Sequence, residues 1–361
     1  MGTCELCRER PANKKNTHYL TDGIIRSCLN EDGSNAREKA MMFNISWNED
    51  SIEAKFQRST STDAIARTYG REAKEEEIDE AKNVPFSVDY VFCSECEDIF
   101  TEIENKFIKD ILPQLRGKDF TGRPEITLDD TFTVRKFFLL QVYRTAICDP
   151  DYQIDNALVE KLREIILGIN NDIETLKSIP LNITYLNTVG ADYEYTKNTV
   201  GVAVIENNKL ILFNDFVIQV FDDIKNASFV DLWGINDRRD FKYFTNYCEE
   251  RFRVKILDNK QRLQAWDNYH KERANKQVNF YRRTFAVSYI KQHHRPPAPG
   301  LVRTFVDLSR KKEIESCGCG DSDCPVYMLS DNACKKMDQI RHEIFGTIRN
   351  IKPGSPLKLS Q

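Results

Sequence analysis

The chain has 361 residues, 40% of them hydrophobic and 30% charged, and a formal net charge of −4 at pH 7. This length suits two or three domains with a sizeable core, and the composition is that of an ordinary globular protein, not a polycation. No run of 18 apolar residues occurs, so a transmembrane helix and a membrane partner are not expected.

Cysteine usage points to a reducing compartment. The chain has eleven cysteines, an odd number, and several have the spacing of metal ligands. The N-terminus lacks the apolar stretch of a signal peptide. Free thiols in a cytoplasmic protein are therefore expected, not a disulfide framework.

Two Cys-x2-Cys pairs, Cys4 with Cys7 and Cys93 with Cys96, are the strongest motif. Four thiolates in a tetrahedral site suit zinc, and such a closed site is structural. The site would join residue 4 to residue 96 across a polar stretch from about 30 to 83. The acidic run at 75–80 within this stretch predicts a solvated helix face; a partner-bound insertion is the alternative.

Three further regions follow in chain order. Ile99, Ile103, Phe107 and Ile111 are spaced by four, which predicts an amphipathic helix ending near Pro113. Residues 118–180 are expected to be helical, with one buried helix over 133–147 and another capped by Asp155. Residues 181–232 are β-branched and aromatic, which predicts a small antiparallel sheet with a turn at 207–208.

Residues 236–310 are expected to be helical and are strongly basic, with 17 Lys and Arg against 8 Asp and Glu. Cations neutralise phosphates and exposed aromatic rings stack on unpaired bases, so nucleic acid is the expected partner. The alternative is a solvated face over core aromatics. The candidate contacts are Arg238, Arg239, Lys242, Arg251, Arg253, Arg282 and Arg283.

A second cysteine cluster lies near the C-terminus. Its candidate ligands are Cys317, Cys319, Cys324 and Cys334, with His342 as a replacement. The spacing is not that of a standard zinc finger, and a glycine-rich loop with incidental thiols is the alternative. No P-loop, dinucleotide fingerprint or serine-hydrolase elbow occurs.

The N-terminal motif resembles the bacterial HNH-like endonuclease family with a treble-clef zinc module. The residues that carry the resemblance are Asn16-Thr17-His18-Tyr19-Leu20, Cys93-Ser94-Glu95-Cys96-Glu97 with Glu104, and the apolar segment 137–144. The resemblance covers residues 1 to about 150.

The resemblance implies a metal-dependent nuclease, serving defence against phage or other foreign DNA. His18 would be the general base, and Glu97 or Glu104 would bind Mg²⁺ or Mn²⁺. Thr17 and Glu97 depart from the family, which often has an acidic ligand at the first position and usually Asn or His at the second. A non-catalytic zinc-finger scaffold that binds nucleic acid or a protein partner is the alternative.

The predicted fold is α+β, with a treble-clef-like N-terminal module, a mainly helical body and a small antiparallel sheet. The predicted regions are 1–117 for the zinc module, 118–235 for the helices and sheet, and 236–361 for the basic helices and the cysteine-rich loop.

Overall fold

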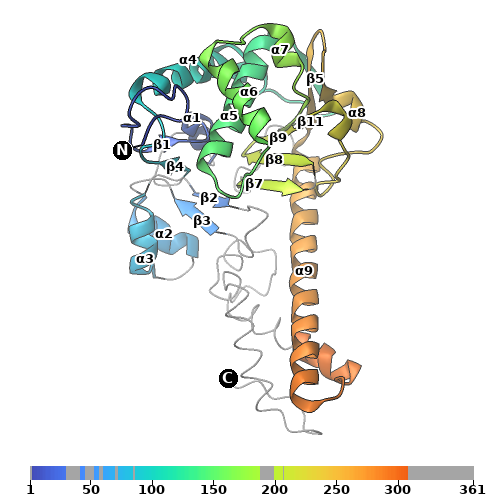
Figure 1. Ribbon diagram of the computed structural model, residues 1–361. Helices are drawn as coiled ribbons and strands as arrows, with labels where there is room; N and C mark the ends of the chain where they lie inside the picture. Colours follow the sequence, from blue (N-terminus) through green and yellow to red (C-terminus); the bar gives the residue numbers. More distant parts are fainter. Residues whose placement is uncertain are drawn as a thin grey trace. The chain divides into compact units, whose positions relative to one another are not determined.

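The computed structural model describes residues 2–29, 41–44, 53–56, 60–69, 72–83, 86–187, 199–205 and 207–307 (Figure 1). The chain divides into two compact units. The first takes in residues 1–48, 54–65 and 73–266, and the second residues 49–53, 66–72 and 267–361. Each unit has a hydrophobic cluster of its own.

The N-terminal part of the first unit is built from segments on both sides of the polar stretch. Strand β1 (Thr17–His18) pairs antiparallel with β4 (Ser87–Val88). Helix α1 (Asp22–Leu29) follows β1, and α4 (Ser94–Asp110) follows β4. Between them lie α2 (Thr62–Tyr69) and α3 (Glu75–Glu80). The acidic run does form a helix, largely exposed, as predicted.

The helices predicted by apolar spacing and capping are confirmed. α4 buries Phe100, Ile103 and Phe107 and is followed by the 3-10 helix η2 (Leu112–Gln114). α5 (Thr131–Cys148) is buried over most of its length, and Phe137 on it stacks on Phe107 at 3.8 Å between ring centroids. Asp155 caps α6 (Asn156–Leu167) by accepting a 2.7 Å hydrogen bond from the Ala157 N–H. The short α7 (Ile173–Lys177) follows.

The sheet is larger than predicted, with nine strands in the described residues, and it is mixed. The central antiparallel strands are β6 (Leu181–Leu186), β7 (Thr199–Ile205), β8 (Asn208–Phe213) and β9 (Phe216–Val220), which match the predicted ones. The strand order is β3-β2-β7-β8-β9-β6-β11-β5, and β10 also pairs with β6. Two of the pairings, β6 with β11 and β2 with β7, are parallel. The added outer strands are β2 (Met41–Asn44), β3 (Glu53–Phe56), β5 (Glu125–Leu128), β10 (Thr245–Asn246) and β11 (Phe252–Leu257).

The prediction that residues 236–310 are helical is wrong at its start, because β10 and β11 lie there. Phe252, Val254 and Ile256 are buried and alternate with Arg253 and Lys255, which is the period of a strand. Between residues 236 and 251, the single-turn α8 (Phe241–Phe244) is the one α-helix. The helical prediction for 118–180 likewise missed β5, which pairs antiparallel with β11.

The two faces of β9 have different coverings. Phe216 contacts the Phe138 ring of α5 at 5.4 Å between centroids, and Ile218 and Val220 belong to the same core cluster. Gln219 points to the other face, where its amide group exchanges hydrogen bonds of 3.0 and 3.1 Å with Asn236. One hydrophobic cluster runs from Cys4 through α4 and α5 to Ile256, so the cysteine module and the sheet share a core.

A buried ion pair fixes α5 to the segment before β11. The Arg135 guanidinium donates two 2.7 Å hydrogen bonds to the Glu249 carboxylate and two more to the carbonyls of Leu176 and Ile179. Neither side chain of the pair is more than 2% exposed. These four hydrogen bonds join α5, the segment before β11 and the end of α7, and neither charge of the pair lacks a partner.

Glu249→Ala is therefore expected to lower the free energy of unfolding by about 3–5 kcal/mol, because the Arg135 charge would remain buried without a partner. Chemical denaturation measures this change. Glu250→Ala is the matched control, since Glu250 is exposed. Equal stability of the two variants would contradict a structural role for the pair.

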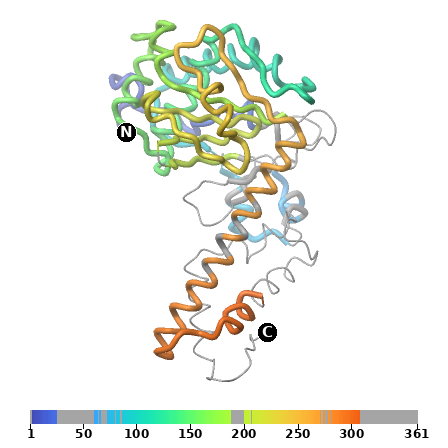
Figure 2. The backbone as a smooth tube through the Cα atoms, turned by 90° about the vertical axis from the view of Figure 1, so that its right-hand side faces the viewer, coloured from blue at the N-terminus to red at the C-terminus, as the bar shows by residue number. Residues whose placement is uncertain are grey.

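The second unit contains most of the long helix α9 (Asn259–His293), which begins in the first unit and is traced in Figure 2. Tyr281, Phe285 and Tyr289, spaced by four, pack against Phe305 and Val306 of a helical stretch over 299–307. Phe285 and Phe305 stack at 4.4 Å between centroids. This aromatic stripe therefore forms a small core of its own.

Candidate metal centre and surrounding polar groups

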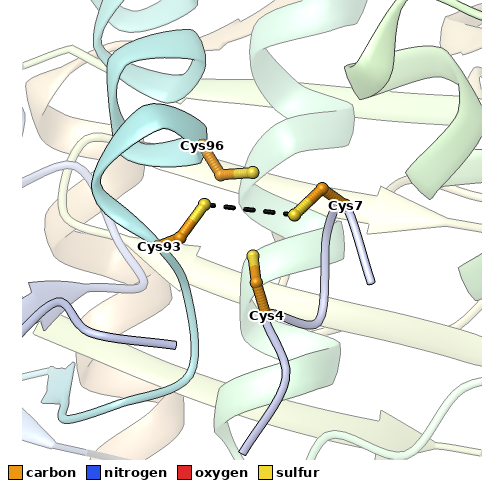
Figure 3. Close-up of side chains that lie close together, drawn as sticks. All are labelled: Cys4, Cys7, Cys93 and Cys96. Carbon is orange, nitrogen blue, oxygen red and sulfur yellow. Dashed lines mark hydrogen bonds between the residues drawn. The ribbon is translucent and has the colours of Figure 1, made fainter. Parts of the chain in front are cut away.

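The four cysteines of the two Cys-x2-Cys pairs lie together (Figure 3). All four sulfur atoms are within 4.8 Å of one another, and the Cys7 and Cys93 sulfurs are 4.0 Å apart. A tetrahedral zinc ion with Zn–S bonds of about 2.3 Å places its sulfurs about 3.8 Å apart. The quartet therefore fits a single four-coordinate ion with a small contraction.

The first pair is presented by a tight turn. The Cys4 N–H donates to the Arg10 carbonyl at 2.8 Å, and the Arg8 N–H donates to the Cys4 carbonyl at 2.9 Å. Arg8 adopts a left-handed backbone with φ of 59°, which reverses the chain after Cys7. The turn directs both sulfurs to the same point.

The second pair comes from the start of α4. Cys93 is the residue before the helix and Cys96 lies in its first turn. A helix N-terminus carries a partial positive charge, which favours thiolates there. In addition, the Arg10 guanidinium donates to the Cys93 sulfur at 3.8 Å. Arg10 was not among the site residues predicted from the sequence.

Burial opposes ionisation at the helix side of the quartet. It raises the pKa of the Cys93 and Cys96 thiols. At Cys7 burial also raises the pKa, but hydrogen bonds from the Glu9 and Arg10 backbone and from neighbouring thiols outweigh it and lower the pKa to about 7. A divalent cation would supply the charge that allows the buried sulfurs to ionise.

His18 is not part of the quartet. It ends β1, and its Nε2 is 3.6 Å from the Asp22 Oδ1 at the start of α1. The two side chains are 29% and 21% exposed, so both are accessible to water. Asp22 was not among the candidate site residues predicted from sequence.

The Glu104 carboxylate interacts with neighbouring side chains of the protein. Its carboxylate accepts a 2.7 Å hydrogen bond from the Thr21 hydroxyl and forms an ion pair with Arg144 of α5. The Arg144 side chain is 3% exposed, and its guanidinium also lies over the Phe100 ring. Arg144 was noted in sequence only as part of an apolar helix, and it is the cation that fixes α4 to α5.

Glu97 directly follows Cys96 on α4. Burial raises the pKa of its carboxyl group, and the nearby Arg144 charge opposes that rise. One Glu97 oxygen is buried without a hydrogen-bond partner, and so is the Thr17 hydroxyl. Because neighbouring strand residues point to opposite faces, the strand directs Thr17, not His18, towards Glu97.

Within the described ranges, the cysteine quartet is the one group of three or more Cys, His, Asp or Glu side chains placed to share a metal ion. The structure thus does not bring His18, Glu97 and Glu104 together as a ready-made ligand set. The second predicted cluster, Cys317, Cys319, Cys324 and Cys334, lies outside the described residues.

The predicted nucleic-acid contacts fall into three groups. Arg239 and Arg251 form ion pairs with Asp237 and Asp129 at 2.5 and 2.6 Å. Arg238 and Arg253 lie over the rings of Phe229 and Tyr243. The remaining three, Lys242 beside them and Arg282 and Arg283 on α9, are exposed.

The chain matches none of the protein-family models, and no curated protein or solved structure is significantly similar to it. Among the helices that the structure describes, none is both long and apolar enough to span a bilayer.

Proposed function

We propose that this chain is an HNH-like nuclease, stabilised by a structural zinc ion, that hydrolyses phosphodiester bonds with His18 as the general base. The observation that carries the proposal is the place of His18 in the fold. It lies on the two-stranded β1–β4 sheet, and β4 leads directly into Cys93 and α4. A cysteine turn, a two-stranded sheet and a helix that begins at the second cysteine pair are the parts of a treble clef.

The acid-base chemistry rests on two side chains. The Asp22 carboxylate, 3.6 Å from the His18 Nε2, would stabilise the imidazolium that forms when His18 takes a proton from the attacking water. A divalent cation such as Mg²⁺ or Mn²⁺ would stabilise the charge on the leaving oxygen. Apart from the cysteine quartet, the described residues offer no group of three ligands for such an ion. The part of the mechanism that the proposal assigns to named residues is therefore the proton transfer by His18 and Asp22.

A non-catalytic zinc scaffold is the second candidate. The observation that favours it is the ion pair between Glu104 and Arg144, which occupies a carboxylate that the nuclease hypothesis assigned to the metal. In this role the same quartet would hold the module together, and the chain would act through binding of nucleic acid or a protein partner.

A cleavage assay separates the two. Supercoiled plasmid and a labelled single strand are incubated with the purified chain, with Mg²⁺, with Mn²⁺, and without added metal. The nuclease proposal requires nicked or linear product, or shortened oligonucleotide, that depends on the added ion. An intact substrate under all conditions, with zinc bound to the protein, would establish the scaffold. The role in defence against foreign DNA is tested separately by phage plating.

A further inference from the structure

A surface of stacked cations and exposed tyrosines surrounds α8. It lies in the first unit and is distant in sequence from the cysteine quartet. We call it the α8 surface; its members are Arg238, Lys242, Tyr243, Tyr247 and Arg253. The Arg253 guanidinium lies 4.7 Å from the Tyr243 ring centroid, and the Arg238 guanidinium 4.8 Å from that of Phe229. Phe229 in turn contacts Phe241 of α8 edge to face at 5.9 Å.

The cations of this region differ in their partners. Arg239, Arg251 and Lys255 form ion pairs with carboxylates. For Arg238, Lys242 and Arg253, the described residues contain no carboxylate within 4.0 Å. An arginine whose flat face rests on a ring keeps N–H groups at its edge, and those groups suit the oxygens of a phosphate.

The tyrosines are unusually exposed for aromatic side chains. Tyr243 is 48% exposed and Tyr247 41% exposed. The Tyr243 hydroxyl donates to Glu125 at 3.2 Å, which holds the ring in place on the outer strand β5. A ring fixed in this way beside unpaired cations can accept a flat, uncharged group next to an anion.

We propose that the α8 surface binds single-stranded nucleic acid, with phosphates at Arg238, Lys242 and Arg253 and bases stacked on Tyr243 and Tyr247. A single strand fits because its bases are free to stack, whereas those of a duplex are stacked on one another. The inference deepens the nuclease proposal by naming the form of the substrate. Because Asp129, Asp237 and Asp240 neutralise the neighbouring cations, the surface holds only a few phosphates.

Fluorescence anisotropy with a labelled oligonucleotide tests this binding in the full-length protein. No Mg²⁺ or Mn²⁺ is added, so cleavage does not contribute, and no chelator is present, so bound zinc is kept. Three phosphate contacts predict a slope of log K against log salt of about −2, at about 0.7 per contact on a single strand. Tyr243→Ala and Tyr247→Ala should each weaken binding roughly 5- to 150-fold.

Tyr90→Ala is the matched control. The Tyr90 side chain is likewise exposed, at 37%, and the Lys15 ammonium lies over its ring. This variant should bind as the parent does. Parent-like binding by both α8 variants would overturn the proposal, as would a duplex that binds as tightly as the single strand and is equally insensitive to them. Cleavage has its own assay, so an inactive protein that binds single strands refutes the nuclease and leaves this inference standing.

Discussion

Cys93→Ser is expected to remove the bound zinc ion and to destabilise the whole first unit. Cys93 is fully buried and is the residue from which α4 starts. It also belongs to the hydrophobic cluster that continues through α5 into the sheet. Loss of the ion would leave three sulfurs, two of them in buried residues, without a cation at the point where two distant segments meet. The damage is therefore not confined to residues 4–96.

The apparent free energy of zinc binding to isolated modules is at least about 10 kcal/mol. A loss of even about 5 kcal/mol would lower the Tm of a unit this size by roughly 10–20 °C. Metal analysis and a thermal melt in reducing buffer measure both effects. Cys248→Ser is the control, because Cys248 is an exposed free thiol outside the quartet. A parent protein without zinc would refute the metal assignment itself.

Local sequence patterns predicted the parts of the fold that depend on local forces. The four-residue spacing from Ile99 to Ile111 predicted α4, and Asp155 predicted the start of α6, because helix faces and caps are set within a few residues. The two Cys-x2-Cys pairs predicted the quartet, because two pairs with that spacing are typical of a four-sulfur zinc site.

The sheet was underestimated because its outer strands pair over long distances in sequence. Lys255 of β11 pairs with Thr184 of β6 in parallel, some seventy residues apart, and no local signal specifies that partner. The strand period of Phe252, Val254 and Ile256 is present in the sequence. The residues that alternate with them, Arg253 and Lys255, are charged, and the high content of basic residues favoured a helical prediction for this region.

The polar groups around His18 show the same limit. Asp22 lies four residues after His18, a spacing with meaning on a helix, but His18 is on a strand and only the turn between them brings the side chains together. Arg144 is one cation in an apolar helix, and only the packing of α5 on α4 shows that it neutralises Glu104. Neighbouring side chains decide whether a carboxylate binds a metal ion or forms an ion pair inside the protein. The sequence alone does not show which side chains those neighbours are.

If the chain is a nuclease, His18→Ala should reduce cleavage by roughly 10²–10⁴-fold, the usual contribution of a general base. Zinc content and Tm should stay close to those of the parent, because His18 is partly exposed and the four cysteines form the quartet without it. Single-turnover cleavage, metal analysis and a thermal melt on the same preparation give the three measurements.

Two further variants fix the interpretation of that result. Asp22→Asn keeps the size of the side chain but removes the charge beside His18, so it should lower the cleavage rate by less than His18→Ala does and leave binding of the substrate unchanged. His294→Ala removes an exposed histidine of the second unit and should cleave as the parent does. Loss of zinc together with activity in His18→Ala would assign His18 to the metal module, whereas full activity in that variant would exclude it as the base.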